Sequence, residues 1–246
     1  MPRPAQPDDI DARLAALGER FGLNEDARGR LRLLHRLLVE DPLAPTAVRD
    51  PRKVIDDHLA DSLVGLEVPE VRAARALADL GSGAGVPGLP LAIALPEVIV
   101  ALVEAASRKC AFLERAVAVC EVGNARVVHA RAEDWPEGLG AFDLVTARAL
   151  APLAVVAEYA APLLAVGGTL VAWRGQRDAA AEEVASRAAS QLGLEPHEIR
   201  RVQPFSGAEN RYLHLMSKVT ETPLGFPRRP GMATKRPLGR NATPAI

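Results

Sequence analysis

Residues 77–88 read LADLGSGAGVPG, and this stretch decides the fold. An apolar run that suits a buried strand carries the acid Asp79. Glycines at alternating positions follow, and then Val86-Pro87, which suits the start of a helix. Because glycine has no Cβ atom, such a loop lets the backbone approach a bound molecule closely. A glycine loop between a strand and a helix also turns backbone N–H groups and the positive helix end toward that molecule. We therefore expect a nucleotide-like cofactor to bind here.

The glycine spacing is compatible with two cofactors. Gly83, Gly85 and Gly88 match G-x-G-x-x-G, which is typical of dinucleotide-binding proteins. Gly81, however, already stands at the strand end where that fingerprint begins, and from there the motif is Asp79-x-Gly81-x-Gly83-x-Gly85. This motif is similar to the first motif of S-adenosylmethionine-dependent methyltransferases, and a purely structural turn is the third interpretation. We favour the methyltransferase motif and assign to cofactor binding Asp79, Gly81, Gly83, Gly85 and Val86.

The next predicted strand supplies an acid with the right placement for a ribose. Residues 98–103 form a continuous apolar run, which favours a strand buried on both faces, and Glu104 ends it. An acid about 20 residues beyond a glycine loop, at a strand's carboxyl end, accepts hydrogen bonds from ribose hydroxyls. That role serves NAD and S-adenosylmethionine alike. The alternative is an acid that stabilises a helix N-terminus.

Two further predicted strands end in candidate site residues. The first, residues 126–130, is followed by Ala132 and Glu133, which we assign to the adenine pocket because methyltransferases line the adenine ring there. A solvated turn is the alternative. The second, residues 142–146, leads to Arg148. Ligands of open α/β sheets bind beyond the carboxyl ends of the strands, and arginine is rarely buried without a partner.

Together these motifs resemble the glucose-inhibited division protein B family, whose members are bacterial 16S ribosomal RNA guanine-N7 methyltransferases. The resemblance rests on DLGSGAGVPGLP (79–90), RAE (131–133) and TARA (146–149), and it covers roughly residues 30–238. VRDP (48–51), HLADSL (58–63) and the basic, proline-rich segment 226–238 are also similar to the family's pattern. The resemblance implies an enzyme that transfers a methyl group from S-adenosylmethionine to N7 of a guanine in 16S ribosomal RNA.

Some positions depart from the family's pattern. Members usually carry Trp-Asn and Asn-Leu-Thr before the turn at 48–51, where this chain has Val39-Glu40 and Ala44-Pro45-Thr46. Arg174 stands where a lysine is common. These changes spare the predicted cofactor site and put in doubt any substrate contact made by the N-terminal segment.

The order of predicted elements favours an α/β fold in three parts. Residues 1–70 have apolar positions at helical spacing, and residues 71–219 alternate strands and helices. The last two strands, near 199–202 and 212–219, lack a long helix between them, which favours an antiparallel edge pair. We expect a Rossmann-like, mostly parallel methyltransferase sheet preceded by a helical segment. Residues 220–246, rich in proline and glycine, are expected to form an extended tail.

Composition limits the partners and the compartment. The 246 residues carry a net charge of −1, so the chain has no global basic field, but the segment from Pro223 onward is basic and contains no acid. That segment is expected to bind RNA, with a merely solubilising tail as the alternative. No apolar stretch is long enough for a membrane span, and the first residues lack the apolar core of a signal peptide. We expect a cytoplasmic monomer without a metal site.

The resemblance also fixes an expected mechanism. Guanine N7 has a free lone pair, so the enzyme mainly has to align the two reactants and exclude water, without a metal or an obligatory base. Arg148 is the residue expected to bridge the cofactor pocket and the substrate, and Arg174, Arg177 and Arg211 are expected to extend a basic rim. The alternative functions are an NAD-dependent oxidoreductase and a non-catalytic RNA-binding assembly factor. His58 and Asp61 either cover the site or only pack and cap.

Overall fold

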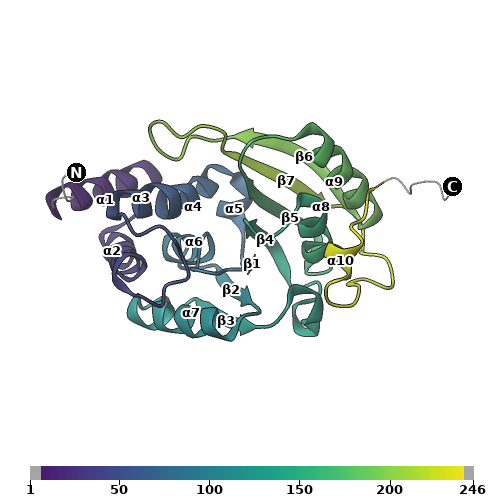
Figure 1. Ribbon diagram of the computed structural model, residues 1–246, viewed down its shortest axis with the longest axis horizontal. Coiled ribbons are helices and arrows are strands. Elements are labelled where there is room, and N and C mark those ends of the chain that lie inside the picture. Colours follow the sequence, from purple (N-terminus) through teal and green to yellow (C-terminus); the bar gives the residue numbers. More distant parts are fainter. Residues whose placement is uncertain (1–6, 241–246) are drawn as a thin grey trace.

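A seven-stranded sheet with the order β3-β2-β1-β4-β5-β7-β6 forms the centre of the computed structural model, which describes residues 7–240 (Figure 1). The five strands β1 to β5 pair in parallel, whereas β7 pairs antiparallel with both β5 and β6. This arrangement confirms the predicted mostly parallel sheet with an antiparallel edge pair. The strands are β1 (Ala76–Leu80), β2 (Ile99–Glu104), β3 (Ala125–His129), β4 (Phe142–Arg148), β5 (Leu164–Arg174), β6 (Leu194–Arg201) and β7 (Tyr212–Lys218).

Helices cover both faces of the sheet (Figure 1). Because successive side chains of a strand point to opposite faces, Leu77 and Leu102 belong to one hydrophobic core and Ala78 and Val103 to the other. The first core includes α1 (Pro7–Phe21), α2 (Glu25–Glu40), α6 (Gly88–Ala94) and α7 (Ser107–Val119). The second core includes α8 (Leu153–Ala160) and α9 (Ala179–Gln191). The sheet is thus the middle layer of three.

The helical segment before the sheet packs onto it. Asn24 caps α2 by accepting a hydrogen bond from the backbone N–H of Ala27, and Asp50 caps the next helix in the same way. The buried leucines of α2 share a core with α6 and α7, so this segment extends their layer. The predicted limits at residues 70 and 219 stay a prediction. The remaining elements before the sheet are α3 (Pro51–Val54), the π-helical turn η1 (Ile55–Ala60), α4 (Asp61–Leu63), η2 (Val64–Glu67) and α5 (Pro69–Ala73).

The fifth strand is long and irregular. The helix α8 ends at Ala160, and β5 already begins at Leu164. The pairing of β4 with β5 shifts in register between Phe142 and Leu144, and Gly167 has φ +92°. Gly167 is therefore part of an irregularity inside a long strand, which glycine permits because it adopts positive φ without steric cost.

The C-terminal segment is folded onto the sheet domain, where an extended tail was expected. It contains the short helix α10 (Met232–Lys235), and Arg228 forms an ion pair with Glu158 of α8. Glu158 is only 2% exposed, and a buried carboxylate is costly unless it is paired, so this contact fixes the segment. Figure 1 shows the segment, in yellow, beside α8. Residues 1–6 and 241–246, which belong to the predicted first and last parts, lie outside the described residues.

Cys110 and Cys120 are both buried and free. Burial raises the pKa of both thiols, that of Cys120 to about 12. Within residues 7–240, no helix is both long and apolar enough to cross a lipid bilayer.

Candidate functional site

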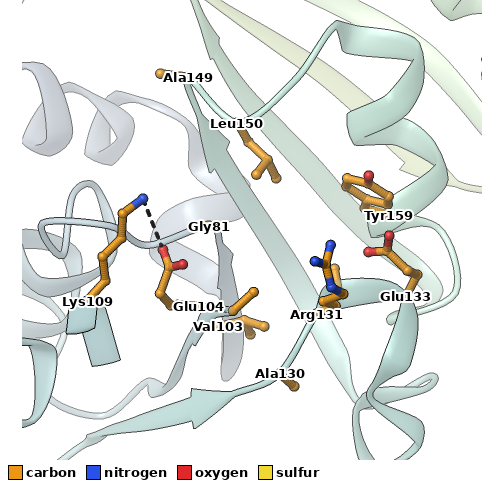
Figure 2. Close-up of a pocket in the computed structure, with 12 residues that line it drawn as sticks. Gly81, Val103, Glu104, Lys109, Ala130, Arg131, Glu133, Ala149, Leu150 and Tyr159 are labelled. Carbon is orange, nitrogen blue, oxygen red and sulfur yellow. Dashed lines mark ion pairs between the residues drawn. The ribbon is translucent and has the colours of Figure 1, made fainter. Parts of the chain in front are cut away.

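The strand order reverses direction between β1 and β4, and a cavity of about 260 Å³ opens there at the carboxyl ends of the strands. Open α/β sheets bind ligands at such a switch point. We call it the loop cavity. Figure 2 shows it with Glu104 and Lys109 on one side and Arg131, Glu133 and Tyr159 on the other. It is lined by Gly81, Val103, Glu104, Ala105, Lys109, Ala130, Arg131, Ala132, Glu133, Ala149, Leu150 and Tyr159.

The glycine loop connects β1 to α6 at the edge of the loop cavity. Gly81 lines the cavity with φ +66°, and an added Cβ atom would lie 2.6 Å from Leu150 Cδ1. Gly85 has φ +84°, and a Cβ atom there would lie 2.4 Å from Leu89 Cδ1. Glycine is therefore required at both positions, for the left-handed backbone and for the close packing. Of the five predicted loop residues, Gly81 reaches the cavity wall; Gly83, Gly85 and Val86 shape the loop behind it.

Asp79 lies beneath the loop and does not line the cavity. Its Oδ1 accepts a hydrogen bond from Thr146 Oγ1 at 2.9 Å, and its Oδ2 accepts one from the backbone N–H of Gly88 at 3.2 Å. The side chain is fully buried, and burial raises its pKa from 3.8 to about 6 although both hydrogen bonds oppose the rise. The carboxyl group thus joins β1, β4 and the start of α6. Asp79 is therefore a residue that positions the glycine loop.

Glu104, the last residue of β2, does line the cavity, as expected. Its Oε2 accepts a hydrogen bond from the Gly83 N–H at 3.1 Å, and its Oε1 accepts one from the Ala106 N–H at 2.9 Å. Lys109 Nζ lies 3.8 Å from Oε2. Although only 6% of Glu104 is exposed, its carboxylate faces the cavity, as Figure 2 shows. This geometry offers a carboxylate acceptor to a diol.

The wall beyond β3 contains the two predicted adenine-pocket residues. Ala132 and Glu133 lie in the 3₁₀ turn η3 (Ala132–Asp134) and line the cavity; a second such turn, η4, follows at Pro136–Gly138. Glu133 Oε1 accepts a hydrogen bond from the backbone N–H of Gly231 at 2.9 Å. The folded C-terminal segment therefore touches the wall of the loop cavity, a contact that the sequence did not indicate.

A second cavity, of about 450 Å³, adjoins the first. Ala149 lines both, with φ +53°, a left-handed conformation that is strained for a residue with a Cβ atom and that occurs preferentially at functional sites. We call it the Arg148 cavity. It is lined by Val48, Asp57, His58, Asp61, Arg148, Ala149, Trp173, Arg174, Gly175, Val202, Arg211 and Tyr212.

Arg148 is fixed by the segment that precedes the sheet. Its Nη1 donates to Asp61 Oδ2 at 2.7 Å and to the backbone oxygen of Asp57 at 2.8 Å. Arg148 was expected to touch the cofactor as well, but its side chain lines the second cavity and not the loop cavity. It ends β4 and precedes the shared residue Ala149, which places it beside the loop cavity.

His58 and Asp61 both line the Arg148 cavity, so they do face the site. His58 Nε2 lies 2.7 Å from Thr46 Oγ1, and its Nδ1 lies 3.4 Å from Arg148 Nη2. Burial, with a smaller contribution from the Arg148 charge, lowers the pKa of His58. Thr46 is the family residue that survives among the departures, and it holds this imidazole.

The expected basic rim is present only in part. Arg174 and Arg211 line the Arg148 cavity. Arg177 does not, because it pairs with Glu182 in the first turn of α9. The sequence did not indicate Trp173, Tyr212, Lys109 or Tyr159, since no local motif marks them. Only the folded chain brings them to the cavities.

The buried carboxyl group of Asp79, which supports the glycine loop, can be tested by the pH dependence of stability. A carboxyl group with a raised pKa binds its proton more tightly in the folded state than in the unfolded state. Its contribution to the free energy of unfolding therefore falls as the pH rises from about 4 to about 6, by about 1.4 kcal/mol per unit of pKa shift. Urea unfolding at several pH values should show this fall in the wild type relative to Asp79→Asn. If the free energy of unfolding of the wild type minus that of Asp79→Asn stayed constant over this pH range, the raised pKa assigned to Asp79 would be wrong.

Comparisons with known proteins identify the family of this chain. A family model described as "GidB: rRNA small subunit methyltransferase G" matches residues 36–208. Ribosomal RNA small subunit methyltransferase G of Desulfitobacterium hafniense is 40% identical over 198 residues, which cover 78% of this chain and 81% of the relative. The protein of that name from Pelotomaculum thermopropionicum is 42% identical over 200 residues, which cover 78% of this chain and 82% of the relative.

Among solved structures, a predicted O-methyltransferase from Agrobacterium tumefaciens is similar with a TM-score of 0.52 and 26% identity, over 67% of this chain and 81% of that chain. The fold is therefore the one that S-adenosylmethionine-dependent methyltransferases share. Given the family model and these relatives, the chain belongs to the GidB family of rRNA small subunit methyltransferases.

Proposed function

We propose that this protein transfers a methyl group from S-adenosylmethionine to N7 of a guanine in the 16S ribosomal RNA of the small subunit. The observation that carries the proposal is the pair of adjoining cavities at Ala149, in a chain of this family. The loop cavity takes the cofactor, and the Arg148 cavity takes the target base. We further propose that the protein acts as a monomer in the cytoplasm, where this RNA is found.

The residues of the loop cavity fit the cofactor. Glu104 offers its carboxylate to the ribose hydroxyls, and Gly81 brings the backbone close to the methionine part. Val103, Leu150 and Ala132 supply apolar wall for a flat base, with Glu133 at its edge. S-Adenosylmethionine, when bound, supplies an electrophilic methyl group on a positively charged sulfur.

The residues of the second cavity have the task of holding the base. N7 attacks with a lone pair that lies in the plane of the ring, so no proton has to be removed before the transfer. Arg148 donates N–H groups toward O6, and the wall around Ala149 aligns the base with the methyl group and excludes water. Because N7 lies on the Hoogsteen edge, the base must leave any stack to reach this cavity.

The folded C-terminal segment is the basic surface that we assign to RNA binding. The segment carries four exposed cationic side chains near α8. The chain as a whole has a net charge of −1, so this segment is the local concentration of positive charge that phosphate groups would contact. The four side chains are Arg229, Lys235, Arg236 and Arg240.

A methyl-transfer assay tests the proposed reaction. The substrates are small ribosomal subunits and bare 16S RNA from a strain that lacks this protein, with labelled S-adenosylmethionine as the donor. The expected product is 7-methylguanosine at a single site, identified by mass mapping. Label in another nucleoside would assign a different methyl acceptor, and absence of transfer to both substrates would contradict the proposal.

Gly83→Asp tests the cofactor site. Gly83 has φ +56°, and its N–H donates to Glu104, so an added carboxylate would stand beside the acid that holds the ribose. We expect calorimetry to show at least a tenfold loss of affinity for S-adenosylmethionine, or about 1.4 kcal/mol. Gly140→Asp is the matched control, since Gly140 has φ +62°, open space around it and no place in the cavity. Equal affinities of the two variants would remove the loop from the cofactor site.

The tail is tested by neutralising charge and not by truncation, because truncation would leave the buried Glu158 without Arg228. We expect the triple substitution Arg229→Gln, Lys235→Gln and Arg236→Gln to weaken binding to 16S RNA. The slope of log K against log[salt] should become shallower by about 2. Cofactor affinity should stay the same. An unchanged slope would exclude this segment from RNA binding.

A further inference from the structure

One oxygen of Asp61 is buried in the wall of the Arg148 cavity without a hydrogen bond. Asp61 is 5% exposed, and its Oδ2 and backbone oxygen are both used, by Arg148 Nη1 and by Trp173 Nε1 at 2.6 Å. Its Oδ1 has no hydrogen-bond partner among residues 7–240. Buried carboxylate oxygens are normally satisfied, so this oxygen in the cavity wall has a free acceptor position for a donor that displaces its cover.

Arg211 lies over this oxygen. Its Nε is 3.3 Å from Asp61 Oδ1, and its Nη2 is 3.6 Å from Asp57 Oδ1, without the geometry of a hydrogen bond at either contact. The Arg211 side chain is 36% exposed, whereas the Asp61 side chain is 8% exposed. A half-exposed guanidinium thus lies between the buried carboxylate of Asp61 and the half-exposed carboxylate of Asp57.

The group that now spans the two carboxylates is a guanidinium, and guanine contains the same pattern of donors. Its N1–H and N2 amino group point in one direction from a common carbon atom, as two N–H groups of arginine do. Adenine offers an acceptor at N1 and no amino group at C2. A pair of carboxylates in this position therefore discriminates between the purines by their Watson–Crick edge.

We propose that Asp61, with Asp57 beside it, accepts hydrogen bonds from N1–H and the N2 amino group of the target guanine, and that Arg211 occupies this place in the ligand-free protein. The inference rests on the proposed function and adds the residue that determines the choice of base. Arg148, on the other oxygen of Asp61, is left facing O6. One buried carboxylate thereby orients both the arginine and the base.

The test compares guanosine with inosine at the methylated position of an otherwise identical 16S RNA fragment or reconstituted subunit. Inosine keeps N7, O6 and N1–H and lacks only the N2 amino group. For the wild type we expect kcat/KM to be roughly ten- to a hundredfold higher with guanosine, which is the effect of one hydrogen bond to a charged group. Equal rates with the two substrates would contradict the proposal.

Asp61→Asn separates base recognition from an effect through Arg148. The asparagine keeps its oxygen toward the donor Arg148 and turns its NH₂ group toward the cavity, where it opposes the amino group of guanine. The ratio of guanosine to inosine rates should fall to about 1. If Asp61 only positions Arg148, both rates fall together and the ratio stays at the wild-type value, which would overturn the proposal.

Asp56→Asn is the matched control. Asp56 lies in η1, the turn before Asp61, pairs with Arg13 and does not line the cavity, so its variant should keep the wild-type ratio. Cofactor affinity, measured by calorimetry, checks that each variant is folded. If the wild type transfers no methyl group to guanosine RNA, the proposed function itself fails, an outcome distinct from transfer without discrimination.

Discussion

The carboxyl group of Asp79 is the contact on which the site depends. It joins Thr146 on β4 and the first N–H of α6 to β1, at the point where the order of the strands reverses. The loop between these elements carries Gly81 to the cavity wall and presents the Gly83 N–H to Glu104. Asp79 is fully buried, and both of its carboxyl oxygens accept hydrogen bonds from these elements. In the proposed function the cofactor binds at this loop, and Asp79 holds the loop in place.

A second contact connects the helices before the sheet to the strands that line the Arg148 cavity. The Arg148–Asp61 ion pair joins the end of β4 to α4, and Trp173 of β5 donates to the backbone oxygen of the same aspartate. The Arg148 cavity therefore exists only when the helical segment is packed onto the sheet. Between the two cavities, Ala149 holds a left-handed conformation that aims neighbouring residues to opposite sides. The two cavities that we assign to cofactor and substrate are thus lined by different parts of the chain and share the residue Ala149.

The sequence predicted those parts of the structure that local patterns specify. Glycine spacing and apolar strands indicated the sheet, the loop and Glu104, because each depends on neighbouring residues. The depth of Asp79 and the turning of Arg148 away from the loop cavity depend on contacts with Thr146 and Asp61, far away in the chain. The folded tail was missed for the same reason, since the Arg228–Glu158 pair joins residues 70 positions apart. The proline and glycine content predicted an irregular C-terminal segment, but it did not indicate that this segment packs against α8.

The most direct test of this account is a crystal structure of the protein with S-adenosylhomocysteine and guanosine 5′-monophosphate. The account predicts the nucleoside of the cofactor product in the loop cavity, with its ribose on Glu104. It predicts the guanine in the Arg148 cavity, with N7 turned toward the sulfur beside Ala149 and the amino group on Asp61. Guanine bound outside that cavity, or with N7 turned away from the sulfur, would contradict the account.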